Sequence, residues 1–449
     1  MFTRIRSAPV LSAITGVALL ASACSPAMGP ADDGPAAQSL GQNKEPDNEI
    51  TVWYFDKLSM DTAIPLFEQA HPGVKVNFVL QPFGDMSQKY LAALAAKQGV
   101  PDVIGLDTSM VGRFLDAGDN LLADPYNAGQ YQNDFVDWKF NAPITQSGEM
   151  AAFPWDVATG VMFYRPDVFQ AAGLPTEPAQ VSQKLATWDD FIQAGQQIKA
   201  ATNGQSSIVA NEKDIFNAAF WQNGGTIAKD GTIEFVDEAQ QPLDVAVKAK
   251  QAQIGANIAT WSERWMPALK SGQVATVIMG AWMLGDFQNL VDPDGAGTWR
   301  IATAPGGAFN NGGTYLQVPK LAQNKQLAWD FVQFVTTNAD TQNAIFQKTG
   351  IVPAYKPAWN SPVYDQPVDY LGGQLAWRQL IELAQQVKPL AYSPVDALGT
   401  DLLNAEVDKA ISGKLTSQQA LLGAATQLQD RAQRASNLQL ALPADAVRS

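Results

Sequence analysis

Cysteine and histidine are nearly absent from this sequence, which has one of each among its 449 residues. A single cysteine, Cys24, excludes an intrachain disulfide. The single histidine, His71, lies in a His-Pro-Gly stop after a predicted helix and has no partner histidine. A Ser-His-Asp triad and a multi-histidine zinc site are therefore disfavoured. A phosphate-binding loop and a G-x-S-x-G elbow are also missing, so we expect no catalytic residue, no metal ligand and no cofactor.

Basic residues are scarce, with 30 Lys and Arg against 44 Asp and Glu and a formal net charge of −14. The first 23 residues contain two arginines and no acid, so their removal as a signal would leave a charge of −16. Such an acidic surface repels nucleic acid and anionic lipid head groups. We expect neither as a partner.

Long apolar runs are missing from the body of the chain, and the run at the N-terminus, "APVLSAITGVALLASA", is shorter than a membrane-spanning helix. Together with Arg4 and Arg6 it predicts an export signal over residues 1–23. The ending "LLASAC" resembles the lipobox of bacterial lipoproteins, in which the cysteine is acylated, although Ala21 stands where leucine is usual. Cys24 is thus a predicted lipid anchor, and the alternative is a plain secretory signal. Residues 24–47, rich in Pro, Gly, Ala and acids, predict a flexible tether.

The body of the chain predicts an α/β fold with two lobes, because 449 residues exceed one ordinary core. Segments 49–55, 74–80 and 101–107 have the pattern of strands, and segments 60–70, 85–99 and 109–118 that of helices. This alternation favours parallel sheets covered by helices on both faces. Ligands of such sheets lie beyond the carboxyl ends of the strands, which nominates Asp56 and Asp107. For both, the alternative role is a helix N-cap.

Later helices are predicted by their start signals. Thr187 with Asp190, and Thr416 with Gln419, have the spacing of capping boxes. Segment 327–335 carries an apolar stripe at helical spacing. These residues are expected to pack and carry no predicted function.

Tryptophans are conspicuous in segments rich in Gly, Asn or Met. An indole face supports the C–H face of a sugar ring, while carboxylates accept its hydroxyl protons. Taken one at a time, packing in the core is the commoner role for such a residue. The tryptophans in question are Trp155, Trp221, Trp265 and Trp282.

An ordered set of segments resembles the family 1 extracellular solute-binding proteins, the maltose-binding-like receptors of bacterial carbohydrate ABC importers. The segments are "EMAAFPWDVATGVMFYRPDVFQAAGL", "TWDDF", "LKSGQVATVIMGAWMLGDF", "GGTYLQVPKLAQNKQLAWDFVQFV", "TGIVPA" and "EVDKAISGKLTSQQAL". The resemblance covers nearly all of residues 49–430. One departure is Arg165, where the family often has asparagine.

The resemblance implies a periplasmic-binding-protein-like fold of type 2, with hinge crossings and a ligand cleft between two lobes. It divides the chain into lobe 1, residues 48–156 plus 301–353, and lobe 2, residues 157–300 plus 354–449. Trp155 would stack on a sugar ring, Asp156 would accept hydroxyl protons, and Trp282 would be the opposing platform. Thr159 and Gly160 would let the backbone turn at the pivot. The expected ligand-binding residues are Trp155, Asp156, Trp282, Asp107, Asp56, Trp221, Gly313 and Tyr392.

The implied function is that of a lipid-anchored, extracytoplasmic and monomeric receptor that passes a neutral di- or oligosaccharide, chemically unchanged, to a membrane permease. Three alternatives stay open. A glycoside hydrolase needs only two carboxylates. A receptor for phosphorylated or other anionic solutes needs arginines, and only Arg113 and Arg264 could be nominated. A structural or adhesive surface protein would bind no small ligand.

Overall fold

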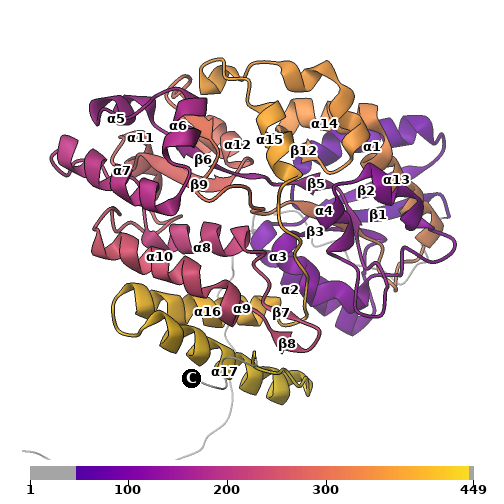
Figure 1. Ribbon diagram of the computed structural model, residues 1–449. Helices are drawn as coiled ribbons and strands as arrows, with labels where there is room; N and C mark the ends of the chain where they lie inside the picture. Colours follow the sequence, from indigo (N-terminus) through magenta and orange to yellow (C-terminus); the bar gives the residue numbers. More distant parts are fainter. Residues whose placement is uncertain (1–46, 444–449) are drawn as a thin grey trace, which may run out of the picture. The chain divides into compact units, whose positions relative to one another are not determined.

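The computed structural model describes residues 47–443, which form an α/β fold with two main sheets and two smaller two-stranded ones (Figure 1). Cys24 and the predicted signal 1–23 lie outside the described residues, as does nearly all of the predicted tether. No helix in the described part of the chain is both long and apolar enough to cross a membrane.

The first sheet has the strand order β2-β1-β3-β11-β4. Strands β1, β2 and β3 pair in parallel, whereas β11 is antiparallel to both β3 and β4. Only part of this sheet therefore has the parallel pairing expected from the sequence. Its strands are β1 (Glu49–Tyr54), β2 (Lys75–Leu80), β3 (Val103–Asp107), β4 (Phe153–Pro154) and β11 (Thr314–Gln317).

Both faces of the first sheet are covered, because its strands are apolar on both sides. Along β1, Val52 and Tyr54 belong to one core, whereas Trp53 points into the other, as the two-residue period of a strand requires. The face of Val52 packs on α1, α4, α13 and α14, and the opposite face packs on α2, α3 and η1. The helical segments of this lobe are α1 (Lys57–Ala70), α2 (Phe83–Ala96), α3 (Thr108–Val111), η1 (Gly112–Ala117), η2 (Ala128–Asp134), α4 (Asp137–Asn141), α13 (Lys325–Thr337), α14 (Ala339–Thr349), η4 (Lys356–Asn360) and η5 (Pro362–Asp365).

The second sheet has the order β10-β6-β9 with antiparallel pairing throughout. The prediction of parallel sheets is wrong for this lobe, because its strands come from segments far apart in the chain and are not joined by successive strand-helix-strand crossovers. The strands are β6 (Gly160–Tyr164), β9 (Thr276–Gly280) and β10 (Arg300–Ala302). The helical segments around this sheet are α5 (Pro166–Ala171), α6 (Pro178–Lys184), α7 (Trp188–Ala201), α8 (Glu212–Gln222), α11 (Trp265–Lys270), α12 (Met283–Asp286), η3 (Phe287–Val291), η6 (Asp369–Leu371) and α15 (Trp377–Ala384).

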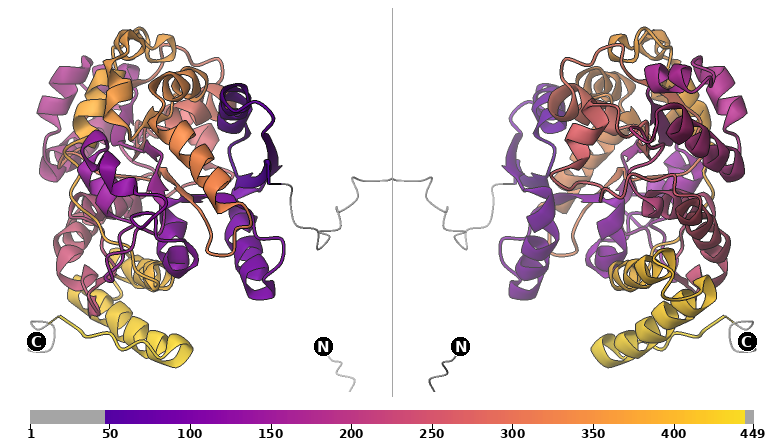
Figure 2. Two further views of the ribbon diagram at one scale, coloured as in Figure 1. Left: turned by 90° about the vertical axis from the view of Figure 1, so that its right-hand side faces the viewer. Right: turned by 90° about the vertical axis from the view of Figure 1, so that its left-hand side faces the viewer.

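A further helical layer lies beside α8, with α16 and α17 side by side at its outer edge (Figures 1 and 2). Its apolar residues form one core, which also takes residues from α8. The predicted capping box of Thr416 and Gln419 is confirmed at the start of α17. The elements are β7 (Ala228–Lys229), β8 (Thr232–Ile233), α9 (Phe235–Glu238), α10 (Gln240–Gln251), α16 (Asp396–Ile411) and α17 (Ser417–Ser436).

The chain passes between the two sheets through crossing segments that bond to one another. Strand β5 (Asp156–Val157) joins β4 to β6 and pairs with β12 (Val352–Pro353). The Gly160 amide donates to the Phe309 carbonyl at 2.8 Å, and the Asn311 amide donates to Ala158 at 2.9 Å. Gly160 is needed for space rather than for a turn, because a Cβ there would lie 2.3 Å from the Phe309 ring.

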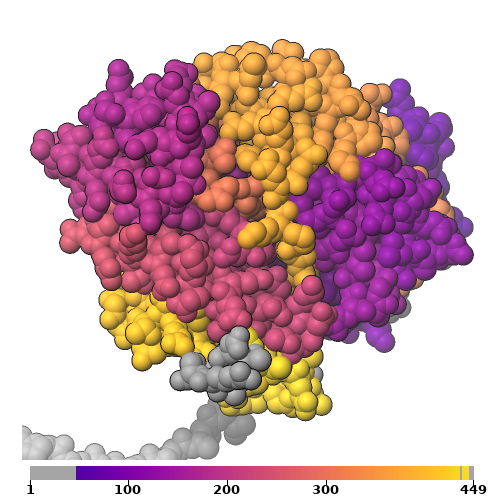
Figure 3. Space-filling model, viewed as in Figure 1, coloured from indigo at the N-terminus to yellow at the C-terminus, as the bar shows by residue number. Residues whose placement is uncertain are grey.

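The lobe boundaries expected from the sequence need two corrections. The chain leaves the second sheet only after β10, so lobe 1 does not resume at residue 301. Trp359 and Tyr364, expected in lobe 2, pack in the core of the first sheet, since η4 and η5 lie beside α14. After α15 the chain runs over the surface toward α16, between elements of the two lobes (Figure 3).

The start of α16 also contacts the first lobe. A Cβ at Gly112 would lie 2.4 Å from the Ser393 carbonyl oxygen and 2.6 Å from Asp396 Oδ2. Oδ2 accepts the Ser393 amide at 2.9 Å, whereas the buried Oδ1 has no hydrogen-bond partner among the described residues. Burial raises the pKa of Asp396 to about 7. The neutral carboxyl is therefore the form that the folded chain favours.

Replacement of Asp396 by asparagine should change how stability depends on pH. In the wild type, the stability that the neutral carboxyl provides is lost as pH rises from about 4 to about 7, because the unfolded chain releases this proton earlier. Asp396→Asn removes that loss, so at pH 8 it should be more stable than the wild type by about 1 to 3 kcal/mol. Urea unfolding at pH 5 and pH 8 measures the difference. Asp401→Asn, exposed on the same helix, is the control, and parallel profiles for wild type and Asp396→Asn would contradict the assignment.

Candidate functional site

The carboxyl ends of β1 and β3 each carry an aspartate that starts the next helix. Asp56 accepts the Leu58 amide at 3.0 Å, and Asp107 accepts the Ser109 amide at 2.9 Å. Both aspartates are half-buried. The N-cap role considered for these residues is confirmed. A carboxylate that caps a helix keeps lone pairs free, so a ligand role is compatible with the cap.

Asp156 lies in β5, inside the crossing region, and is only 6% exposed. Its Oδ1 accepts the Thr314 amide at 2.8 Å. Burial raises the pKa of Asp156 to about 6, while the positive charge of Lys139 acts in the opposite direction. Asp156 thus ties the first residue of β11 to the crossing strand.

The three aspartates converge on Tyr54. The Tyr54 hydroxyl lies 3.1 Å from Thr314 Oγ1. Burial raises the pKa of Tyr54 well above its usual value, and the charges of Asp156, Asp56 and Asp107 raise it further. The structure therefore brings these predicted residues to one edge of the first sheet.

Gly312 and Gly313 form the backbone of that edge, with φ values of +108° and +87°. A Cβ at Gly312 would lie 3.3 Å from Trp282 Nε1, in the second lobe, and 3.8 Å from Asp107 Oδ2, in the first. A Cβ at Gly313 would lie 3.0 Å from Lys139 Nζ. Side chains from both lobes thus meet around two residues without side chains. We call this cluster, which consists of Gly312 and Gly313 with the surrounding Asp107, Lys139, Asp156 and Trp282, the diglycine site.

Lys139 is a member of the diglycine site that sequence reasoning missed. It is completely buried, and Nζ lies 3.8 Å from the centre of the Tyr315 ring. Burial lowers the pKa of Lys139 to about 8, against the opposing charges of Asp156 and Asp107. A single lysine in "DWKFN" carries no sequence signal of burial, since lysines are almost always exposed.

Trp155 does not offer a free face to a ligand. It is 2% exposed and packs in the core of the first lobe, with its ring centre 4.9 Å from that of Tyr54. The expectation that it stacks on a sugar ring is therefore not supported in this conformation, because the strand pairing on either side fixes the ring inward. The packing role is the one that the structure shows.

Trp282 and Trp261 form an aromatic platform on the second lobe. Trp282 is 38% exposed and Trp261 is 49% exposed, and their rings stack at 6.2 Å with an interplanar angle of 15°. Trp282 Nε1 donates to the Asn311 carbonyl at 2.7 Å, which fixes the ring beside the crossing segment. Trp265, also singled out in the sequence, is buried beneath them, 4.6 Å from Trp261.

Sequence reasoning missed Trp261 because only its backbone conformation sets it apart from the other tryptophans. Its φ of +65° is rare for a bulky residue and is typical of strained functional loops. The loop is held by the preceding Thr260, whose hydroxyl lies 2.8 and 2.9 Å from the two carboxylate oxygens of Asp214. Burial raises the pKa of Asp214 to about 6, and the contact with Thr260 opposes that rise.

Trp221 and Tyr392 occupy two different borders of the crossing region. Trp221 is half-buried on α8 and stacks on Phe309 at 6.2 Å, next to the Asn310–Gly313 segment. The Tyr392 hydroxyl lies 3.3 Å from that of Tyr315, so it joins the segment after α15 to the first sheet.

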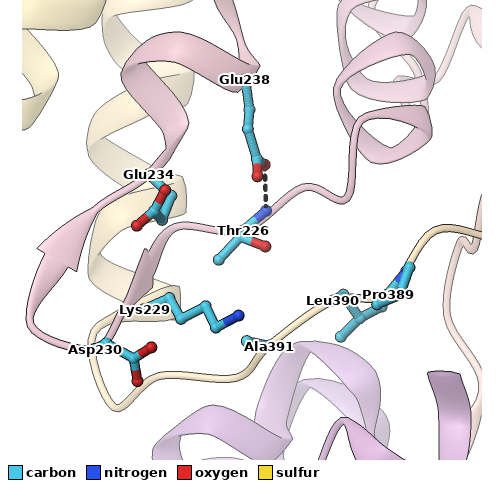
Figure 4. Close-up of a pocket in the computed structure, with 8 residues that line it drawn as sticks. All are labelled: Thr226, Lys229, Asp230, Glu234, Glu238, Pro389, Leu390 and Ala391. Atoms are coloured by element: carbon cyan, nitrogen blue, oxygen red, sulfur yellow. Dashed lines mark hydrogen bonds between the residues drawn. The ribbon is translucent and has the colours of Figure 1, made fainter. Parts of the chain in front are cut away.

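Two pockets lie away from the diglycine site. One of about 370 Å³ is acidic, and Figure 4 shows Glu238 accepting the Thr226 amide at 3.0 Å, with Pro389–Ala391 on the opposite side. The other, of about 410 Å³, is an apolar groove bordered by Leu91 and Leu321. Neither contains a predicted ligand-binding residue. Among the described side chains, no group of three or more His, Cys, Asp or Glu could hold a metal ion.

Arg113 and Arg264 do not form the cluster that an anionic ligand would require. Arg113 borders the apolar groove and donates to Ser87 at 3.1 Å. Arg264 is exposed immediately before α11. The charged residues around the diglycine site are Asp107, Asp156 and Lys139.

Gly313→Ala should destabilise the protein by about 2 to 4 kcal/mol. The new Cβ meets Lys139 Nζ and the Asp156 carbonyl oxygen, 3.1 Å away, in addition to the cost of a positive φ. Gly148→Ala is the matched control, because Gly148 has a φ of +80° and open space around the missing Cβ. It should cost only about 1 kcal/mol. Urea unfolding compares the two, and equal losses would contradict the crowded geometry.

Residues 62–370, more than half of the chain, match the family described as bacterial extracellular solute-binding protein. The arabinooligosaccharide-binding protein of Bacillus subtilis (strain 168) is 26% identical over 420 residues, which cover 88% of this chain and 95% of that protein. The lactose-binding protein of Rhizobium radiobacter is 26% identical over 364 residues, which cover 77% of this chain and 84% of that protein.

Solved structures share the fold. A crystal structure of an extracellular solute-binding protein of family 1 has a TM-score of 0.76 at 24% identity, covering 85% of this chain and 99% of that one. The ABC transporter associated binding protein from B. animalis subsp. lactis Bl-04, in complex with β-1,6-galactobiose, has a TM-score of 0.69 at 22% identity, covering 88% and 100%. The chain therefore belongs to the bacterial extracellular solute-binding protein family and has its two-lobed α/β fold.

Proposed function

We propose that this protein is the substrate-binding component of an ABC importer that captures a neutral di- or oligosaccharide between its lobes and delivers it to a membrane permease. The observation that carries the proposal is the diglycine site. There a half-exposed indole of the second lobe lies beside a half-buried carboxylate of the first. Indole faces and acceptor-only carboxylates together suit a ligand with apolar ring faces and many hydroxyls.

Two stacked tryptophans favour a ligand of more than one ring. Trp261 and Trp282 are both more than a third exposed, so two indoles rather than one are available to a ligand. The names of the relatives agree, because they specify arabinooligosaccharides and lactose. We therefore favour a di- or oligosaccharide over a monosaccharide.

Capture would work by a shift between open and closed arrangements of the lobes. A ligand that contacts both Asp107 and Trp282 binds better when the two are close, so it favours the closed arrangement. The permease would then recognise the closed form. No bond of the sugar changes in this scheme.

The alternative functions fit the site less well. A glycosidase needs one carboxyl to donate a proton and another to attack or activate water. Here Asp56 and Asp107 cap helices and Asp156 accepts a backbone amide. The anionic-solute alternative keeps one supporting observation, which is a relative named as the sn-glycerol-3-phosphate-binding protein of Salmonella typhimurium, 25% identical over 407 residues. Glycerol 3-phosphate therefore belongs in the test.

Ligand-dependent thermal stabilisation tests the proposal. The chain from residue 25 onward is heated with arabinotriose, lactose, β-1,6-galactobiose and glycerol 3-phosphate, and we expect a rise in Tm with a neutral sugar. Trp282→Ala and Trp261→Ala should each weaken binding of that sugar about 10- to 100-fold, a loss of about 1.4 to 2.8 kcal/mol. Leu290→Ala, whose side chain is 57% exposed, is the control and should bind as the wild type does. A rise only with glycerol 3-phosphate would replace the sugar with an anionic ligand.

The protein is further proposed to be held at the outer face of the cell membrane by acylation of Cys24. Expressed from residue 1 in a bacterial host, the chain should incorporate radiolabelled palmitate and sediment with membranes. Cys24→Ser should abolish both, because no other cysteine is available. Label retained in Cys24→Ser, or a wild-type chain that is secreted without label, would contradict anchoring and favour a plain secretory signal.

A further inference from the structure

Lys139 presents an unusual buried charge. Lys139 lies in the short helix α4 of the first lobe, and its side chain is 0% exposed. Nζ makes no hydrogen bond among the described residues. Its nearest support is the face of Tyr315, with Nζ 3.8 Å from the ring centre. An ammonium group that is buried and lacks hydrogen bonds is costly, so a compensating interaction is required.

The compensation comes from carboxylates at the diglycine site. The negative charges that act on Lys139 are those of Asp156, in β5, and Asp107, at the end of β3. The other titratable groups facing this cluster are the hydroxyls of Tyr54, Tyr315 and Tyr392, and Asp56, whose charge acts on Tyr54. Lys139 is the positive charge that acts on Asp156 most strongly.

The distance between the lysine ammonium and the carboxylates matters as much as their charges. A lysine bonded directly to a carboxylate occupies its lone pairs, whereas a lysine that acts only through space leaves them free. Asp107 uses Oδ1 to cap α3, and its Oδ2 lies 3.8 Å from the Cβ position of Gly312, toward Trp282. A ligand hydroxyl donates a stronger hydrogen bond to a carboxylate oxygen than to a neutral acceptor.

We propose that Lys139 is a positioning residue of the ligand site, whose buried ammonium keeps the neighbouring Asp156 ionised as a hydrogen-bond acceptor at the diglycine site. This inference rests on the proposed function, because it assigns the carboxylate a hydroxyl-bearing ligand. Without the cation, burial would favour the protonated carboxyl, which is a donor and a weaker acceptor.

Carboxyl titration tests the electrostatic step without any ligand. In protein labelled with ¹³C at the aspartate carboxyl groups, the Asp156 signal of the wild type should titrate near pH 6. In Lys139→Met the midpoint should rise by about one pH unit. Lys184→Met, an exposed lysine at the end of α6, should leave it in place, and Lys139→Arg should restore it. An unchanged Asp156 midpoint in Lys139→Met would overturn the proposal.

If Lys139→Met does not fold, the reciprocal experiment decides. Coupling between two titrating groups acts on both, so removal of the Asp156 charge must change the titration of Lys139. With ¹³C at the lysine ε carbons, Lys139 should titrate near pH 8 in the wild type and at a lower pH in Asp156→Asn. The same midpoint in both proteins would also overturn the proposal.

The pH dependence of arabinotriose affinity tests whether the charge of Lys139 affects ligand binding. In Lys139→Met the acid limb of its pH–affinity profile should move up by about the same one pH unit as the carboxyl midpoint, and Lys139→Arg should return it to the wild-type position. A purely structural role of Lys139 would weaken binding equally at all pH values, which would contradict the inference. If no sugar binds to the wild type, the proposed function fails. The two titrations still decide whether Lys139 sets the ionisation of Asp156.

Discussion

The close approach of backbone and side chains at Gly312 and Gly313 is the constraint on which the site depends. Here the chain crosses from the second sheet to the first, and a side chain at either position would collide with or crowd its neighbours. The missing side chains leave room for Trp282 from one lobe and for Asp107 and Lys139 from the other. Because the same residues belong to the crossing segment, the proposed ligand recognition and the proposed lobe movement would share one piece of backbone.

The electrostatics of this region follow from burial. Burial raises the pKa of Asp156 and lowers that of Lys139, and the charge of each opposes the shift of the other. Asp56 and Asp107 stay closer to solvent and are oriented by the helices they cap. The region thus combines two half-buried acceptors, Asp56 and Asp107, with the buried charge pair of Asp156 and Lys139.

The sequence predicted the fold class and the first strands and helices, and it nominated Asp107, Asp156, Gly313 and Trp282, which the structure places around the diglycine site. These predictions succeeded because the end of a strand, and each segment that resembles the family, can be recognised from a short stretch of sequence. Sequence reasoning failed where the outcome depends on contacts between distant segments. Examples are the inward ring of Trp155, the buried Lys139, and Trp359 and Tyr364 in the first core. Trp261 required a backbone angle that no composition reveals.

The pair of nearly parallel indoles on the second lobe has an optical consequence. Two chromophores stacked in this way share their electronic excitation, so the near-ultraviolet circular dichroism of the protein carries a component that depends on their mutual orientation. If a sugar binds on these indoles as proposed, it would change their relative orientation or their surroundings. The change in circular dichroism would then report binding without an attached dye.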